Sequence, residues 1–150
     1  MPQSLAKNLI HLIYSTKNRD GCLTPAIRPK LFAYQAGILQ EWDSPALVIG
    51  GDADHVHALF ILSKNHTLCK VIEEVKKGSS KWIKTQGKGF ARFHWQNGYG
   101  AFSVSQSHVT RVRRYIERQT EHHRTMSFQE EFRLFLKRHG IEYDERYVWD

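Results

Sequence analysis

The sequence predicts an α+β domain: a four-stranded antiparallel sheet of the ferredoxin-like split βαβ type, flanked by helices. The first observation is the order of predicted elements, which is strand, helix, strand, strand, helix, strand and then two helices. The second is the apolar run 58–62, which does not alternate and so predicts a strand covered on both faces. The third is that the 150 residues contain no repeat and no Gly-, Ser- or Pro-rich linker. We therefore expect residues 1–150 to form a single domain, with a C-terminal helical extension that carries Tyr115.

The first half of the chain supplies one strand, one helix and a second strand. Residues 8–16 are rich in Leu, Ile and Tyr, which predicts the first strand. Thr24–Pro25 predicts an N-cap followed by proline at the first position of a helix that ends near residue 42. Residues 46–49 predict a short strand, and the Gly-Gly-Asp sequence at 50–52 predicts a turn after it.

The middle of the chain supplies the central strand and a long helix. Residues 55–62 (HVHALFIL) predict the strand. Thr67 predicts the N-cap of a helix whose apolar positions continue to Trp82 at helical spacing. Residues 86–99 are rich in glycine and aromatic residues and predict a loop or a short strand.

The last third supplies a strand and two helices. Residues 101–105 alternate and predict a strand. Ser107 predicts the cap of a helix that continues to about residue 122. Ser127 and Glu130 form a capping-box pattern for a final helix, which Gly140 is expected to close.

The charge distribution points to a polyanionic partner. The chain carries a net charge of +7, and residues 64–118 hold twelve lysines and arginines against three glutamates, a local net charge of +9. A concentrated basic segment is typical of nucleic-acid binding, although a solvated basic surface gives the same composition. The basic side chains that we expect to contact DNA are Lys76, Lys77, Lys81, Lys84, Arg111, Arg113, Arg114 and Arg118.

Other classes of protein are excluded by composition. No apolar run approaches the roughly 20 residues that a membrane span requires. Two cysteines cannot build a disulfide framework or a four-cysteine zinc site. The first eight residues lack the layout of a signal peptide, so we expect a cytoplasmic protein with reduced thiols.

A His-x-His pair lies in the predicted central strand. His55 and His57 are two residues apart, and strand side chains alternate, so both imidazoles project from one face. Two imidazoles on one face can bind a divalent metal ion. The alternative interpretation is a pair of half-exposed histidines that hydrogen-bond to water or to the backbone. The position in a central strand favours a function, because unpaired polar side chains are costly there.

A tyrosine lies on a basic predicted helix. Tyr115 and Gln119 are four residues apart and share a face that differs from the apolar stripe of Val109, Val112 and Ile116. Four neighbouring arginines (Arg111, Arg113, Arg114 and Arg118) should attract phosphate and lower the pKa of Tyr115. Gln119 could donate its amide oxygen to a metal ion. The alternative interpretation is an amphipathic helix with a solvated basic face.

The two elements together predict a phosphoryl-transfer chemistry. A divalent ion bound by His55, His57 and Gln119 would polarise a phosphate oxygen while Tyr115 attacks the phosphorus. The phosphotyrosine linkage that forms conserves the energy of the broken bond, so the step can reverse. The predicted activity is therefore the breaking and rejoining of strands and not simple hydrolysis.

Four stretches in this order resemble the single-tyrosine HUH (His-hydrophobic-His) transposases of small bacterial insertion sequences, which include repeat-associated tyrosine transposases. These stretches are NLIHLIYSTKNR (8–19), GGDADHVHALFIL (50–62), WQNGYGAFSVS (95–105) and YIERQTEHH (115–123).

The resemblance implies a DNA transposase. It would cut single-stranded DNA near hairpin ends, leave the 5′ phosphate on Tyr115, and free a 3′ hydroxyl. His55, His57 and Gln119 would bind Mg²⁺ or Mn²⁺. The protein would be a homodimer with composite active sites and would act on the bacterial nucleoid.

Two other functions are compatible with the sequence. A non-catalytic module could bind single-stranded nucleic acid by stacking bases on sheet aromatics, for which the candidates are Phe90, Phe93, Trp95, Tyr99 and Phe102. A metal-dependent nuclease could use water as the nucleophile. A binding module leaves DNA intact, a nuclease leaves no adduct, and a transposase leaves a covalent adduct.

Overall fold

The computed structural model describes residues 2–150 and is built on one four-stranded sheet. The strands are β1 (Asn8–Ser15), β2 (Ala46–Gly51), β3 (His55–Leu62) and β4 (Gly100–Val104). They lie in the order β2-β3-β1-β4, and each neighbouring pair is antiparallel. This is the strand order of the split βαβ plan, so the predicted fold class is confirmed.

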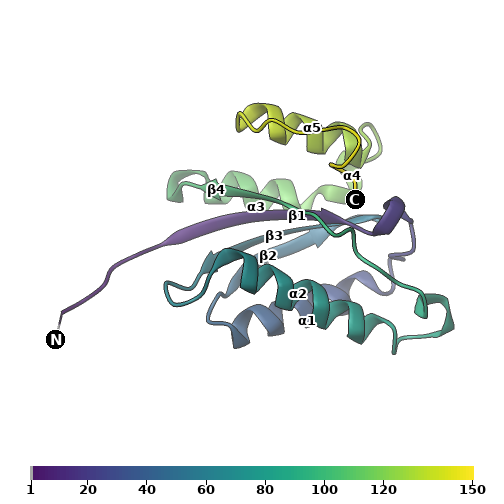
Figure 1. The fold of residues 1–150 in the computed structure, drawn as a ribbon, viewed down its shortest axis with the longest axis horizontal. Helices are drawn as coiled ribbons and strands as arrows, with labels where there is room; N and C mark the ends of the chain where they lie inside the picture. Colours follow the sequence, from purple (N-terminus) through teal and green to yellow (C-terminus); the bar gives the residue numbers. More distant parts are fainter. Residues whose placement is uncertain (1) are drawn as a thin grey trace.

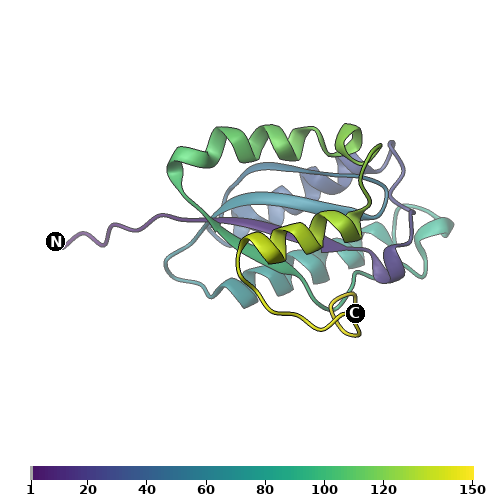
Figure 2. The ribbon, with the colours of Figure 1, turned by 90° about the horizontal axis from the view of Figure 1, so that it is seen from above.

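Helices cover the sheet on both faces. Figure 1 shows α1 (Arg28–Glu41) and α2 (Leu68–Ile83) on one side of the sheet. On the other side lie α3 (Val109–Glu117), α4 (Gln119–His122) and α5 (Phe128–Arg138), and Figure 2 shows α3 and α5 side by side over the strands. We call these the α1/α2 face and the α3/α5 face. Three short 3₁₀ turns complete the regular structure at Lys17–Arg19, Lys88–Phe90 and Gln106–His108.

On the α1/α2 face, the sheet packs against the helices through apolar side chains. Alternate side chains of the central strands, including Leu12 and Tyr14 of β1 and Phe60 of β3, pack against the apolar stripes of the two helices. The stripe of α2 is formed by Val71, Ile72, Val75 and Ile83, each nearly inaccessible to solvent.

Two glycines bring the helices of the α3/α5 face close to the strands. A Cβ atom on Gly50 of β2 would lie 2.4 Å from the carbonyl oxygen of Ile116 in α3. A Cβ atom on Gly100 of β4 would lie 2.5 Å from the ring of Phe132 in α5. Any other residue type would require the backbone of α3 to shift at Gly50 and the ring of Phe132 to shift at Gly100.

Several local predictions are confirmed and several are wrong. Thr67 accepts a hydrogen bond from the amide of Lys70, and Ser127 accepts one from the amide of Glu130, as capping predicts. Gly140 has a φ of +64° directly after the last helix cap, which is the conformation expected of a closing glycine. Residues 86–99 form a loop, one of the two predicted alternatives, and its only regular element is a 3₁₀ turn.

The helix predicted from Ser107 to residue 122 is interrupted. It begins with a 3₁₀ turn, Ser107 makes no cap, and Arg118 (φ −102°, ψ 19°) separates α3 from α4. Gly50 and Gly51 belong to β2, so the predicted turn begins only at Asp52. α1 begins at Arg28, because residues 25–27 form a separate turn. Within residues 2–150, no helix combines the length and apolar character needed to cross a membrane.

Candidate active site

The His-x-His pair lies at the end of β3 and faces α3 and α5. His55 and His57 are fully buried, and their ring centroids are 5.2 Å apart. Ser15 and Ile13 of β1 lie opposite them in the sheet. The prediction that both imidazoles share one face is confirmed, and the alternative of half-exposed histidines is wrong.

The outward nitrogen of each imidazole is held by a second side chain. Nδ1 of His55 lies 2.7 Å from Oδ1 of Asp54, and Nδ1 of His57 lies 2.8 Å from Nε2 of His11. A partner at Nδ1 fixes the ring orientation and leaves Nε2 directed into the site. Burial lowers the pKa of His57 to about 4, which favours the neutral imidazole that metal ligation requires.

Gln119 reaches the same site from α4. Its Oε1 lies 2.8 Å from Nε2 of His55, and the residue is 1% exposed. The break at Arg118 begins a new helical turn at Gln119. The sequence prediction that Gln119 lies away from the packing face is wrong, whereas its predicted proximity to the histidine pair is correct.

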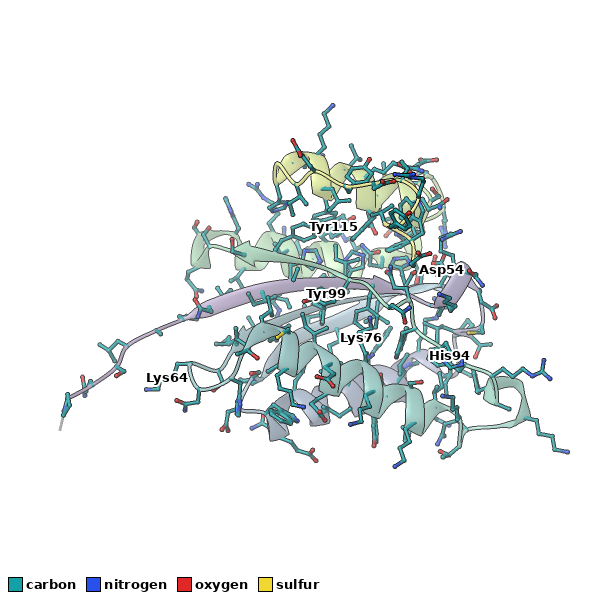
Figure 3. The ribbon with its side chains drawn as sticks, in the orientation of Figure 1. Asp54, Lys64, Lys76, His94, Tyr99 and Tyr115 are labelled. Atoms are coloured by element: carbon teal, nitrogen blue, oxygen red, sulfur yellow. The ribbon has the colours of Figure 1, made fainter. Side chains whose placement is uncertain are left out.

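Tyr115 is half-buried above the histidines. Its ring meets that of His57 edge to face, with centroids 5.7 Å apart, and its hydroxyl donates a hydrogen bond to Oε2 of Glu131. Figure 3 shows Tyr115 between the sheet and α5. A single chain therefore brings together Tyr115, His57 and Gln119.

The electrostatic environment of Tyr115 differs from the sequence prediction. Burial and the adjacent Glu131 carboxylate raise the pKa of Tyr115 above its ordinary value, so the side chain is a phenol near neutral pH. The expected lowering fails because the four arginines are exposed, so that solvent screens their charge. A carboxylate in direct contact outweighs these screened charges.

Glu131 of α5 was not predicted as a site residue. It is 1% exposed, and its carboxylate lies 2.9 Å from Nε2 of His57, 3.2 Å from Nε2 of His123 and 3.1 Å from Nε2 of Gln119. Burial alone would raise the pKa of Glu131, but the surrounding imidazoles hold that pKa well below its ordinary range. One signal was available in the sequence, because Glu131 falls inside the buried stripe of Phe128, Phe132 and Leu136.

The histidine nitrogens and carboxylate oxygen that face into the site form a set of ligand atoms that fits a divalent metal ion. Ligand atoms of His55, His57, His123 and Glu131 all lie within 4.8 Å of one another. Ligands of a six-coordinate ion at about 2.1 Å are about 3–4 Å apart, so small adjustments would accommodate an ion. Imidazole nitrogens, an amide oxygen and a carboxylate are ligands that manganese accepts.

The basic residues expected to contact DNA lie on two sides of the sheet. Arg111, Arg114 and Arg118 line a surface hollow of about 350 Å³ beside Tyr115. Lys77 and Lys81 on α2 and Lys84 at its C-cap are exposed, and α2 packs on the opposite face. Figure 3 shows Lys76 across the sheet from Tyr115. Arg113 is exposed on α3.

Lys76 is not free to bind phosphate. Its ammonium donates hydrogen bonds to the carbonyl oxygens of Gln96, Asn97 and Gly98 at 2.7, 3.0 and 2.8 Å. The three donors of the ammonium group are therefore used within the chain, and the side chain holds the loop before β4. We remove Lys76 from the predicted DNA-binding residues.

The aromatic side chains expected to stack on bases are mostly in the core. Phe93, Trp95 and Phe102 are 5%, 6% and 3% exposed, and the indole of Trp95 donates a hydrogen bond to Ser79. The side chains of β1 and β3 are almost all buried between the two helical layers, so these central strands offer no open surface on which bases could stack. Of the five candidates only Tyr99 is exposed, at 41%.

Comparisons with known proteins identify the family of the chain. A sequence model described as "Transposase IS200 like" matches residues 4–119. A putative transposase from Deinococcus radiodurans R1 shares the fold with a TM-score of 0.63 and 20% sequence identity, over 80% of this chain and 96% of that one.

A second structure, a REP-associated tyrosine transposase bound to a REP hairpin, has a TM-score of 0.57 and 13% identity over 79% of this chain and 70% of that one. No curated protein matches the sequence. At these identities the two structures establish the fold alone, whereas the sequence match spans most of the chain. The chain therefore belongs to the IS200-like transposase family.

Proposed function

We propose that this protein cleaves and rejoins single-stranded DNA through a 5′-phosphotyrosine intermediate on Tyr115. One observation carries the proposal: within one chain, the ring of Tyr115 packs against that of buried His57, and its hydroxyl donates to Glu131, which also contacts His57 and Gln119. Membership of the transposase family supports the same DNA-processing role. We also propose that residues 1–150 act as one domain, since both helical layers share a single sheet.

His55, His57 and Gln119 would hold the metal ion, which we propose to be Mg²⁺ or Mn²⁺. Asp54 and His11 orient the two imidazoles so that Nε2 of His55 faces Gln119 and Nε2 of His57 faces Glu131. When bound, the ion would supply positive charge to a phosphate oxygen and stabilise charge that develops during transfer.

Tyr115 supplies the attacking oxygen. A bond forms between its phenolic oxygen and phosphorus, the bond from phosphorus to the 3′ oxygen breaks, and the phenolic proton is transferred to the departing 3′ oxygen. The products are a 5′-phosphotyrosine and a free 3′ hydroxyl. The reverse reaction, with another 3′ hydroxyl as the nucleophile, rejoins DNA.

DNA binding would use the exposed arginines beside the hollow. Arg111, Arg114 and Arg118 line it, and Arg113 is exposed on the same helix, so a phosphodiester backbone could approach Tyr115 along this surface. By likeness to the relative bound to a REP hairpin, we propose that the substrate carries hairpin ends.

The assembly can be tested separately from the chemistry. The family resemblance implies a homodimer with composite sites, whereas Tyr115 and His57 already meet within one chain. Mixing a Tyr115→Phe variant with a His57→Ala variant discriminates between the two. Restored cleavage would support composite sites in a homodimer, and persistent inactivity would support cleavage within one chain.

The function is tested by incubating the protein with a library of single-stranded hairpin oligonucleotides and Mn²⁺, followed by a denaturing gel. We expect a covalent protein–DNA adduct that a chelator abolishes and that His55→Ala does not form. Cleavage without an adduct would indicate a water-using nuclease. Binding without cleavage would indicate a non-catalytic module, which the buried aromatic residues disfavour.

A further inference from the structure

The C-terminal helix reaches the proposed metal centre from outside the part of the chain that the family model matches. That match ends at residue 119, whereas α5 spans Phe128–Arg138. We propose that Glu131 is a fourth protein ligand of the divalent ion, beside His55, His57 and Gln119. The bound ion would then connect α5 to β3. This inference rests on the proposed function, because it requires the metal centre at His55 and His57.

Position is the first argument. Oε1 of Glu131 lies 2.9 Å from Nε2 of His57 and 3.7 Å from Nε2 of His55, the two nitrogens that face into the site. These separations match those between neighbouring ligands of one ion. Glu131 therefore lies where a carboxylate ligand would lie.

Charge is the second argument. The two imidazoles and the amide of Gln119 carry no negative charge, and all three residues are buried. A divalent cation in such a site requires compensating negative charge. Glu131 is the one buried acidic residue in the described part of the chain, and carboxylate oxygen is the ligand that Mg²⁺ and Mn²⁺ prefer.

The composition of α5 is the third argument. Its buried positions are otherwise apolar, with Phe128, Phe132 and Leu136 packed against Phe102 and Ile13. An apolar residue at position 131 would complete this stripe without the cost of burying a carboxylate. A buried glutamate in this stripe is explained by an electropositive partner such as a metal ion.

His123 supports the same arrangement. Its Nδ1 donates to the carbonyl oxygen of Met126 at 2.6 Å, and its Nε2 lies 3.2 Å from Oε1 of Glu131 and 2.9 Å from Oε1 of Gln119. His123 thus orients two of the proposed ligands from the segment that connects α4 to α5. The ion would therefore link β3, α4 and α5.

The test measures metal binding and not only catalysis. Isothermal titration with Mn²⁺ is performed on the full chain and on Glu131→Gln, which preserves the size of the side chain and removes its charge. We expect the dissociation constant to rise at least about tenfold, since even residues that only support ligands cost about 10–100-fold in affinity. The matched control is Glu130→Gln on the same helical turn, where the side chain is exposed, and its affinity should stay within about twofold.

The outcomes separate this inference from the proposed metal centre. If wild type binds Mn²⁺, His57→Ala does not, and Glu131→Gln binds like wild type, the metal centre stands and the ligand assignment is overturned. If Glu131→Gln cleaves DNA faster than wild type with unchanged Mn²⁺ affinity, the ligand assignment is also overturned. Glu131 would then act only by holding the hydroxyl of Tyr115 in a hydrogen bond. If wild type binds no divalent ion, the metal-dependent function itself fails.

A second measurement does not depend on the variant folding. Hydrogen–deuterium exchange of wild-type α5 should slow when Mn²⁺ is added, because the ion would hold the helix to β3. Amides of α2 on the opposite face serve as the internal reference. Unchanged exchange in α5 at saturating Mn²⁺ would overturn the inference.

Discussion

The two faces of the sheet differ in the kind of side chain that they bury. Against α1 and α2, β1 and β3 present Leu12, Tyr14 and Phe60 to a continuous apolar core. Against α3 and α5, the same two strands present His11, His55 and His57, which form a buried polar network with Gln119 and Glu131. Buried hydrocarbon stabilises a fold without further requirements, whereas buried polar groups must be matched one by one.

This difference indicates how work is divided within the molecule. The α1/α2 face buries the larger apolar cluster, whereas the α3/α5 face combines a smaller apolar cluster with a polar network that holds the reactive groups. Removing a side chain from the first face should therefore change stability, and removing one from the second should change chemistry.

The largest expected effect on stability comes from the α1/α2 face. Phe60→Ala removes a fully buried ring and should lower the free energy of unfolding by about 3–5 kcal/mol, measured by urea denaturation. The activity of the fraction that remains folded should be unchanged. A folded variant that loses DNA cleavage would show that the two faces are not separable.

Short of removing Tyr115 or one of the paired histidines, the largest expected effect on chemistry comes from Gln119. Gln119→Ala should reduce the rate of adduct formation about 100-fold, because loss of its link to His55 lets the helix that carries Tyr115 shift. Gln119→Glu should retain more activity, since a carboxylate oxygen can replace the amide oxygen. A rate for Gln119→Ala within about twofold of wild type, at limiting Mn²⁺, would remove Gln119 from the site.

A single methyl group on β2 should affect both properties. Gly50→Ala places a Cβ atom against the Ile116 carbonyl, so α3 must move and carry Tyr115 with it. We expect adduct formation to fall about 10–100-fold, with a stability loss of about 1–3 kcal/mol.

The matched control for this substitution is Gly37→Ala in α1, where the added methyl group meets nothing within 4 Å. It should raise stability by about 0.5–1 kcal/mol and leave the rate unchanged. Full activity in Gly50→Ala would contradict the view that this close approach sets the position of Tyr115.

The two faces also differ in how many of their contacts can be predicted from the sequence. The apolar face follows from periodicity, because Phe60 and the stripe of α2 repeat at strand and helix spacing. His55, His57 and Gln119 could be predicted from local spacing and resemblance. The contacts of Glu131 and His11 could not, because these residues lie 74 and 46 positions from His57 and meet it only in the folded chain.

The same limit explains the wrong electrostatic prediction at Tyr115. The sequence shows four nearby arginines, but they are exposed to solvent, whereas burial and a glutamate 16 residues away raise the pKa of Tyr115. It likewise explains Lys76, whose ammonium is bound by a loop 20 residues away. Neighbours in sequence are a poor guide to neighbours in a buried site.

The smallest expected effect concerns the basic side chains. Replacing Arg114 and Arg118 together with glutamine should reduce the slope of log affinity for single-stranded DNA against log salt by up to about 1.4, if both contact phosphate. As a matched control, replacing Lys81 and Lys84 on the opposite face with glutamine should change the slope less. Both slopes are measured by fluorescence anisotropy between 50 and 200 mM salt, roughly the range over which such contacts are weakened. Equal changes in slope for the two double variants would mean that DNA contacts both faces.

The account depends most directly on the identity of the nucleophile. Adducts formed with a single-stranded hairpin oligonucleotide and Mn²⁺ can be digested and mapped by mass spectrometry, for wild type, Tyr115→Phe and Tyr99→Phe. Tyr99 is 41% exposed and lies in the loop before β4, so it controls for a reactive surface phenol. We predict a nucleotide on Tyr115 in wild type and in Tyr99→Phe, and none in Tyr115→Phe although that variant still binds DNA. An adduct that persists in Tyr115→Phe would contradict the account.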